Sequence, residues 1–163
     1  MRLLNCAELF LRQGEQVVQE LENSDYEILR KESLNLGSIC HGDYNQHNVL
    51  FNGNQIAITN FDKWNYDIQV ADLYHFMRKI LEKHNWDLSM GLGMLDTYQE
   101  VKPLSKAELN NLRIRLAYPW KFWKLCNFYS STNKAWISGK NMEKLDQLQR
   151  QWKNWLYFLE KAF

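Results

Sequence analysis

The stretch His41-Gly42-Asp43-Tyr44-Asn45-Gln46-His47-Asn48 decides how the rest of this chain is interpreted. In it, Asp43 is followed five residues later by Asn48, which is the spacing of the catalytic loop of phosphoryl-transfer enzymes. In that chemistry the carboxylate accepts or orients the proton of an attacking hydroxyl, and the amide oxygen faces a Mg²⁺ ion that bridges phosphates. Five residues let the chain reverse and bring both side chains to one opening. We therefore expect a phosphoryl-transfer centre here.

The segments around this loop are typical of short strands. The apolar residues 36–40 lead into the loop, and residues 49–51 leave it as another apolar segment. Asn52-Gly53 then predicts a two-residue hairpin turn, because both residues tolerate positive φ. The chain returns through the strand 55–58 and reaches Asn60-Phe61-Asp62. We expect the hairpin to bring residues 60–62 beside the loop.

Further segments show a resemblance to a known family. These segments are Asp72-Leu73-Tyr74-His75-Phe76-Met77-Arg78-Lys79, Tyr118-Pro119-Trp120-Lys121-Phe122-Trp123 and Lys134-Ala135-Trp136. Together with the loop and the hairpin they resemble the aminoglycoside phosphotransferase and choline kinase superfamily, and most closely its kinase-like spore coat (CotS-type) proteins. The resemblance extends over nearly the whole chain. It implies a mainly α fold with a small β-hairpin, which is the C-terminal lobe of a protein-kinase-like fold.

The chain is expected to form one domain. Its 163 residues suit a single domain, and 45% apolar residues are enough for a core. We divide residues 1–163 into a catalytic loop at 41–48, a metal-side loop at 60–62 and a helical subdomain at 69–163. A complete kinase also has a β-rich N-terminal lobe with a phosphate-covering loop and a strand lysine. The residues before His41 predict helices instead, so we expect the C-terminal lobe alone.

The resemblance implies a role for each residue of the centre. Asp43 would be the catalytic base, with His41 orienting the loop. Asn48 would be a ligand of the cofactor's metal ion, and Asp72 a buried acid that braces the loop from below. Asn60 falls where the superfamily carries its second metal ligand, an Asp. Because Mg²⁺ prefers anionic oxygen, a neutral amide there weakens the site. Mg²⁺ and ATP are thus expected as cofactors of a full-length protein, with weak or no binding by this chain.

Several of these residues also allow a structural interpretation. Asp62 is either a substitute metal ligand or a solvated acid of the loop. Asp72 either braces the catalytic loop or caps a helix. Trp64 and Tyr66 either contact a ligand or fold the metal-side loop back onto the lobe. The candidates for a substrate cleft are His47, Trp64, Tyr66, Trp120 and Trp123.

Apolar residues at three- and four-residue steps predict the helices. The predicted helices are a first one that ends at about Glu22, a short one with a capping box at Ser24-Asp25-Tyr26-Glu27, one from Val70 to about Lys83, one from Asp87 to Val101, one that begins with the capping box Ser105-Lys106-Ala107-Glu108, and a final one from Asn141. Pro119 should kink or divide the fifth, because proline lacks an N–H. We expect Leu109, Leu112, Leu116, Trp120 and Trp123 to share one face there. The residues expected to face the core in the last helix are Met142, Leu145, Leu148, Trp152, Trp155, Leu156 and Leu159.

Charge, hydropathy and cysteines exclude several classes of protein. A net charge of +1 and the absence of a nucleic-acid motif argue against a nucleic-acid partner. No apolar run approaches the ~20 residues that span a bilayer, and the N-terminus lacks a signal-peptide pattern, so we expect a cytoplasmic protein without a membrane partner. Cys6, Cys40 and Cys126 are widely spaced, which predicts reduced, partly buried thiols, with Cys40 packed in a strand.

Two functions remain open. The lobe belongs either to an ATP-dependent kinase that phosphorylates a hydroxyl of a small molecule, or to a kinase-like protein incorporated in the spore coat, in which the loop is kept as scaffold. We favour the second. The partners implied are other coat proteins or a missing N-terminal lobe in the second case, and a small-molecule substrate in the first.

Overall fold

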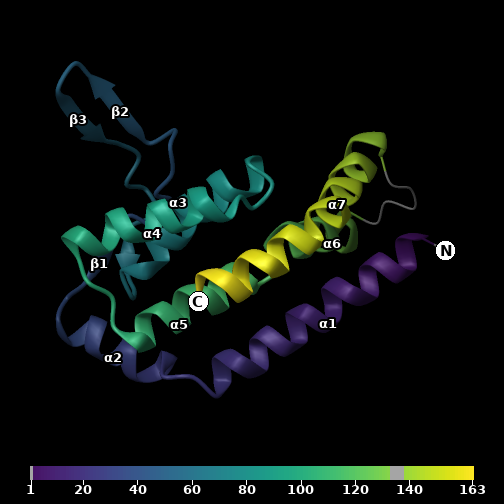
Figure 1. The fold of residues 1–163 in the computed structure, drawn as a ribbon, viewed down its shortest axis with the longest axis horizontal. Coiled ribbons are helices and arrows are strands. Elements are labelled where there is room, and N and C mark those ends of the chain that lie inside the picture. The colour runs from purple at the N-terminus through teal and green to yellow at the C-terminus, as the bar shows by residue number, and fades with distance from the viewer. Residues whose placement is uncertain (1, 133–137) are drawn as a thin grey trace.

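The computed structural model describes residues 2–132 and 138–163, so the segment Lys134-Ala135-Trp136 lies outside the described residues. Helices carry most of the described chain, and short strands interrupt them after the second helix (Figure 1). The elements are α1 (Arg2–Glu22), α2 (Tyr26–Asn35), β1 (Ile39–Cys40), β2 (Val49–Asn52), β3 (Gln55–Ile58), β4 (Asn65–Tyr66), α3 (Val70–Lys83), α4 (Leu88–Val101), α5 (Lys106–Ala117), α6 (Trp120–Thr132) and α7 (Gly139–Ala162). The expected mainly α fold with a small β-hairpin is confirmed.

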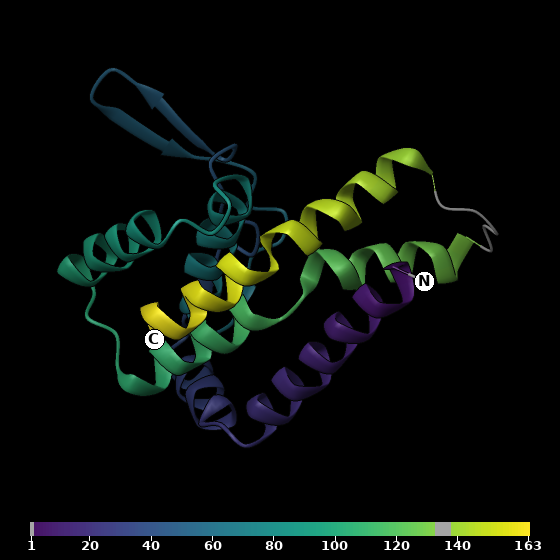
Figure 2. The same ribbon diagram turned by 45° about the vertical axis from the view of Figure 1, so that its right-hand side comes forward.

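Helix α5 lies at the centre of the helical body, where it packs against α1, α2, α3 and α7 (Figures 1 and 2). Its start follows the predicted capping box, because the Ser105 hydroxyl accepts the Glu108 N–H at 3.2 Å and the Glu108 carboxylate accepts the Ser105 N–H at 2.9 Å. Its end is set by Pro119, which separates α5 from α6 as expected. The buried residues of the core are Phe10, Val17, Ile68, Val70, Leu73, Tyr74, Met77, Leu81, Trp86, Leu95, Leu112, Ile114, Leu116, Ala117, Phe122, Trp155, Phe158 and Leu159.

Aromatic side chains join the first helix to the last two. Phe10 of α1 stacks on Phe122 of α6 at 5.0 Å between ring centroids and meets the edge of Trp152 of α7 at 4.9 Å. The indole N–H of Trp155 donates to the Leu116 carbonyl at 2.9 Å, which satisfies the one polar group of a buried ring. Segments far apart in sequence are therefore held in one core.

The β2–β3 hairpin projects from the helical body (Figures 1 and 2). Its strands are antiparallel with Asn52 opposite Gln55, so the turn consists of Gly53 and Asn54, and the prediction of a turn at Asn52-Gly53 was wrong by one residue. Gly53 has φ 58°, a left-handed conformation that glycine adopts without strain. Phe51 and Ile56 leave 74% and 66% of their surface exposed. The hairpin thus carries an apolar surface that the described chain does not cover.

Two local predictions near the strands and α2 require correction. The strand expected over 36–40 is only Ile39–Cys40, which pairs with β4. The capping box at Ser24 does not form, because α2 begins one residue later with Asp25 as its N-cap. The Ser24 hydroxyl instead donates to the Leu21 carbonyl at 2.7 Å and accepts the Tyr26 N–H at 3.2 Å. Ser24 therefore belongs to the turn that follows α1.

Two predicted core faces differ from the structure. Trp120 and Trp123 are exposed rather than buried beside Leu112 and Leu116, because the break at Pro119 starts a new helix with its own phase. Leu156 of α7 is also exposed, and the core position is taken by Phe158, which is fully buried. The remaining members of the predicted α7 face are buried or partly buried: Met142, Leu145, Leu148, Trp152, Trp155 and Leu159.

The described cysteines differ in their burial. Cys40 is buried as expected, and burial raises the pKa of its thiol to about 11. Cys126 is exposed, so its expected partial burial is wrong: the side chain borders a surface groove between α1 and α6. The side chain of Cys6 lies outside the described residues.

None of the described helices is both long and apolar enough to cross a bilayer.

Candidate functional site

The catalytic loop is anchored to α3 by the carboxylate of Asp72. Asp72 lies in the first turn of α3, and its two oxygens accept the backbone N–H groups of His41 at 2.6 Å and Gly42 at 3.0 Å. The N-cap of α3 is Gln69, which makes no side-chain cap bond. Between the two interpretations of Asp72, the hydrogen bonds therefore match the brace. Buried backbone donors need such partners, so this carboxylate fixes where the loop begins.

Close backbone packing holds the loop against the metal-side loop. Gly42 has φ 78°, and a Cβ at this position would lie 2.0 Å from the Lys63 carbonyl oxygen, so only glycine fits. The His41 ring is buried and spans the same interface. Its Nδ1 accepts the Asp43 N–H at 3.2 Å, which leaves Nε2–H to donate to the Thr59 carbonyl at 2.9 Å. His41 thus orients the loop through both ring nitrogens.

Asn48 of the catalytic loop and Asn60 of the metal-side loop face each other. The Asn48 side-chain NH₂ donates to the Asp43 backbone carbonyl at 2.9 Å, so its Oδ1 points toward Asn60. Asn60 Nδ2 lies 3.5 Å from that oxygen. Asn60 has φ 67°, a left-handed conformation that Asn tolerates better than most residues. The hairpin therefore brings residue 60 beside residue 48, as the sequence predicted.

Asp43 is held by two lysines that the sequence analysis missed. Lys63 Nζ lies 2.9 Å from Asp43 Oδ2, and Lys79 Nζ lies 3.2 Å from Oδ1. The ammonium group of Lys63, and then that of Lys79, lower the pKa of Asp43 to about 2 against the opposing effect of its partial burial. Asp43 is thus a carboxylate at neutral pH and a weak base. Lys79 lies seven residues after Asp72, on the same face of α3, and this spacing could have indicated it.

The residues of the centre do not fit a tight divalent-cation site. Magnesium sites in proteins are built on carboxylate oxygens. Here the group opposite Asn48 is a neutral amide, and the carboxylate of the catalytic loop, Asp43, is already paired with two cations. Asp62 is exposed and makes no hydrogen bond or ion pair with other described residues. Within residues 2–132 and 138–163, no group of three or more His, Cys, Asp or Glu side chains is placed to hold a metal ion.

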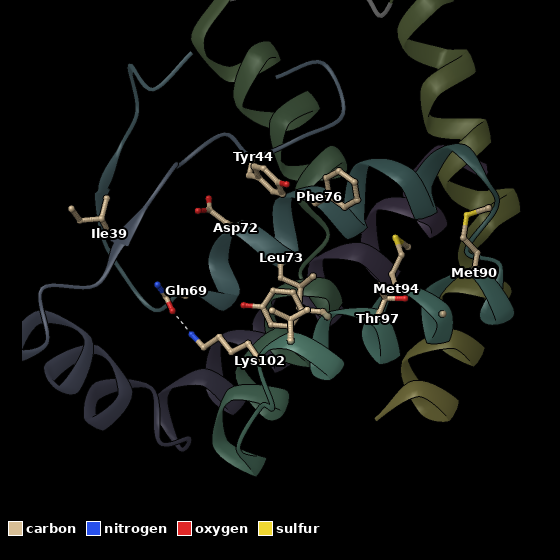
Figure 3. A pocket seen from close by; sticks show the side chains of 13 residues that line it. Ile39, Tyr44, Gln69, Asp72, Leu73, Phe76, Met90, Met94, Thr97 and Lys102 are labelled. Carbon is tan, nitrogen blue, oxygen red and sulfur yellow. Dashed lines mark hydrogen bonds between the residues drawn. The ribbon is translucent and has the colours of Figure 1, made fainter. Parts of the chain in front are cut away.

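A groove of about 910 Å³ opens between α3 and α4 beside the loop (Figure 3). It reaches the catalytic loop at Tyr44, whose ring lies 5.4 Å from that of Phe76 on α3. Asp72 also lines it, but its oxygens are taken by the loop. The lining residues are Ile39, Tyr44, Gln69, Asp72, Leu73, Phe76, Met90, Gly93, Met94, Thr97, Tyr98, Val101 and Lys102.

The structure does not bring the predicted cleft residues to this groove. Trp64 and Tyr66 are half exposed and meet edge to face at 5.8 Å, on β4 and the turn before it. His47 is exposed on the catalytic loop. Trp120 and Trp123 stack on each other at 5.1 Å on α6. None of the five lines the α3–α4 groove.

Comparisons with known proteins agree with this geometry. A family model described as "Spore coat putative kinase YutH" matches residues 9–162. Spore coat protein S of Bacillus subtilis (strain 168) is 27% identical over 139 residues, which cover 84% of this chain and 40% of that protein. The crystal structure of an aminoglycoside phosphotransferase from Alicyclobacillus acidocaldarius subsp. acidocaldarius DSM 446 has a TM-score of 0.86 at 20% identity, over 98% of this chain and 48% of that one. The chain therefore spans less than half the length of spore coat protein S and less than half of the phosphotransferase chain.

Proposed function

We propose that this chain, which belongs to the YutH family of kinase-like spore coat proteins, serves the assembly of the coat rather than phosphoryl transfer. It is related to aminoglycoside phosphotransferases through its fold. On this proposal the catalytic loop is kept because it is part of the packing that holds β1, α3 and the hairpin together. The protein would be located in the spore coat, and its partners would be other coat proteins.

The observation that carries this proposal is the pair of amides at the centre. Asn60 presents an uncharged group to Asn48 Oδ1, where a kinase needs a carboxylate to hold Mg²⁺ against the phosphates. A lost negative charge at that position costs metal affinity directly. The pairing of Asp43 with Lys63 and Lys79 adds to this, because a carboxylate with a pKa of about 2 takes up a proton poorly at neutral pH.

The test is to separate the chemistry of Asp43 from its place in the fold. We would replace Asp43→Asn in the full protein, in the bacterium that encodes it, and examine the coat by electron microscopy and by lysozyme resistance of the spores. The matched control is Asp96→Asn, the same change at an exposed position of α4. We expect both strains to build a normal coat. A defective coat in the Asp43→Asn strain alone, with normal protein abundance, would overturn the assembly proposal.

The metal side can be tested on the purified chain. Asn60→Asp adds the missing carboxylate opposite Asn48, so we expect it to raise the affinity for Mg²⁺ and Mn²⁺ in calorimetric titrations. Asp43→Asn is expected to change metal affinity little. If Asn60→Asp leaves metal affinity unchanged, position 60 does not correspond to the second metal ligand of the superfamily.

A second candidate is the substrate lobe of an ATP-dependent kinase acting on a hydroxyl group. It is favoured by the geometry of the loop, in which Asp72 accepts the N–H groups of His41 and Gly42 and the Asn48 amide donates to the Asp43 carbonyl. The groove that begins at Tyr44 would then receive the acceptor. Phosphorylation of a small alcohol by the full protein, lost in Asp43→Asn but kept in Asp96→Asn, would support this candidate over the first.

A further inference from the structure

We propose that the α3–α4 groove binds an amphipathic small molecule with an apolar body and an anionic end group. This inference concerns the groove itself and goes beyond the proposed coat function. It does not depend on whether the catalytic loop transfers phosphate.

The walls of the groove fit an apolar body. Leu73 and Phe76 come from α3, and Met90 and Met94 come from α4 (Figure 3). Val101, the last residue of α4, also lines the groove. Small-molecule sites typically enclose ~300–1,000 Å³ and are mostly apolar with a few placed polar groups, and the groove of about 910 Å³ lies within that range. Methionine side chains adapt to the shape of a ligand because they are unbranched and polarisable.

The charge at one end of the groove selects an anion. Lys102 follows the last residue of α4, and its ammonium group donates a hydrogen bond to the side-chain carbonyl of Gln69, a neutral partner (Figure 3). No carboxylate among the described residues lies within ion-pair distance of it. Its positive charge therefore stands at the edge of an apolar surface without a counter-charge from the protein. A carboxylate or phosphate on the ligand would supply one.

The same lining argues against a cationic ligand. Among the described residues that line the groove, Asp72 is the only acidic one, and its two oxygens already accept the N–H groups of His41 and Gly42, one each. A bound amine or polyamine would have to share Asp72 with these two backbone donors, and it would be repelled by Lys102. The groove thus differs in charge from a site for polycationic molecules.

Methionine methyl groups offer a direct probe of this site. Met90 and Met94 line the groove, whereas Met142 lies on α7 outside it and serves as an internal control. We would label the methionine methyl groups with ¹³C and titrate the chain with decanoate, then with decylammonium, below their micellar concentrations. We expect decanoate to shift the Met90 and Met94 signals while Met142 stays unchanged, with decylammonium at least tenfold weaker.

Variants of the lysine decide whether the charge is recognised. Lys102→Gln should weaken decanoate binding about tenfold, and Lys102→Glu should reverse the preference toward decylammonium. Lys106→Gln, an exposed position on α5 outside the groove, is the matched control and should bind as the native chain does. The proposal is overturned by equal binding of the two probes to the native chain, by unchanged decanoate affinity in Lys102→Gln, or by shifts that extend equally to Met142.

Discussion

At the scale of single residues, the two acids next to the catalytic loop have different partners and should respond differently to substitution. Asp72 accepts two backbone N–H groups, whereas Asp43 faces the ammonium groups of Lys63 and Lys79. A part-buried backbone donor that loses its acceptor is shielded from water, but a lysine on a partly exposed surface can return to water. The two residues therefore separate the support of the loop from its chemistry.

We predict that Asp72→Ala lowers the free energy of unfolding by about 2–6 kcal/mol, because it leaves two loop donors unpaired at ~1–3 kcal/mol each. Asp43→Ala should cost less than about 1 kcal/mol, since it removes ion pairs in which Lys63 is largely exposed. Urea unfolding followed by circular dichroism measures both. If Asp43→Ala were the more damaging of the two, the roles of the acids would be exchanged.

The ion pairs of Asp43 also predict a pH dependence. The pKa of Asp43 is lowered from 3.8 to about 2, so its contribution to stability is present above about pH 4 and is lost as the pH falls toward 2. The difference in unfolding free energy between the native chain and Asp43→Asn should therefore shrink between pH 5 and pH 2. High salt should reduce the difference at pH 5, because it screens partly exposed charges. A difference that is constant over this range would contradict the pairing.

At the scale of elements, α4 carries a matched pair of glycines with opposite roles. A Cβ on Gly91 would lie 2.2 Å from Cε2 of Phe158, the fully buried ring of α7, whereas a Cβ on Gly93 would meet nothing within 4 Å. Gly91 thus allows α4 to approach α7, and Gly93 only lines the groove.

We predict that Gly91→Ala destabilises the chain by about 1–3 kcal/mol, because the added methyl group must displace Phe158. Gly93→Ala should stabilise it by about 0.5–1 kcal/mol, because alanine favours the helix over glycine. Thermal melts of the two variants provide the comparison. A stabilising Gly91→Ala would mean that α4 and α7 are not packed as closely as described.

At the scale of the whole molecule, the chain presents the catalytic loop beside an uncovered hairpin. Phe51 and Ile56 of the hairpin are exposed, and the chain covers 48% of the related phosphotransferase structure. Nucleotide binding in kinases needs contacts from a second lobe in addition to the metal. From these features we expect the described part of the chain to bind nucleotide weakly.

We therefore predict that the dissociation constant of the 163-residue chain for Mg·ATP lies above the low-micromolar range. Isothermal titration calorimetry in the presence of Mg²⁺ measures this, with Asn60→Asp as the variant that restores the carboxylate opposite Asn48. We expect Asn60→Asp to strengthen binding, but not to the low-micromolar range. Low-micromolar affinity of the native chain would contradict the prediction.

The sequence predicted the elements more accurately than the surfaces they form. The bounds of α3, the capping box of α5 and the break at Pro119 followed from local patterns, because periodicity, caps and proline act within a few residues. The adjacency of Asn48 and Asn60 followed from the hairpin, whose pairing is also local. The errors at Trp120, Trp123 and Leu156 arose because a helix face is buried only relative to its neighbours, which periodicity does not specify.

By itself, the sequence determined the family, the mainly helical lobe and the neutral amide at position 60, since each depends on residue identity or on local spacing. Only the tertiary structure decided that Lys63 and Lys79 form ion pairs with the carboxylate of Asp43, and that Asp72 accepts hydrogen bonds from the backbone of the catalytic loop. It also decided that a groove with an unpaired Lys102 lies between α3 and α4. The hydrogen bonds among these features join residues up to 36 positions apart, and such contacts depend on how the helices pack against one another.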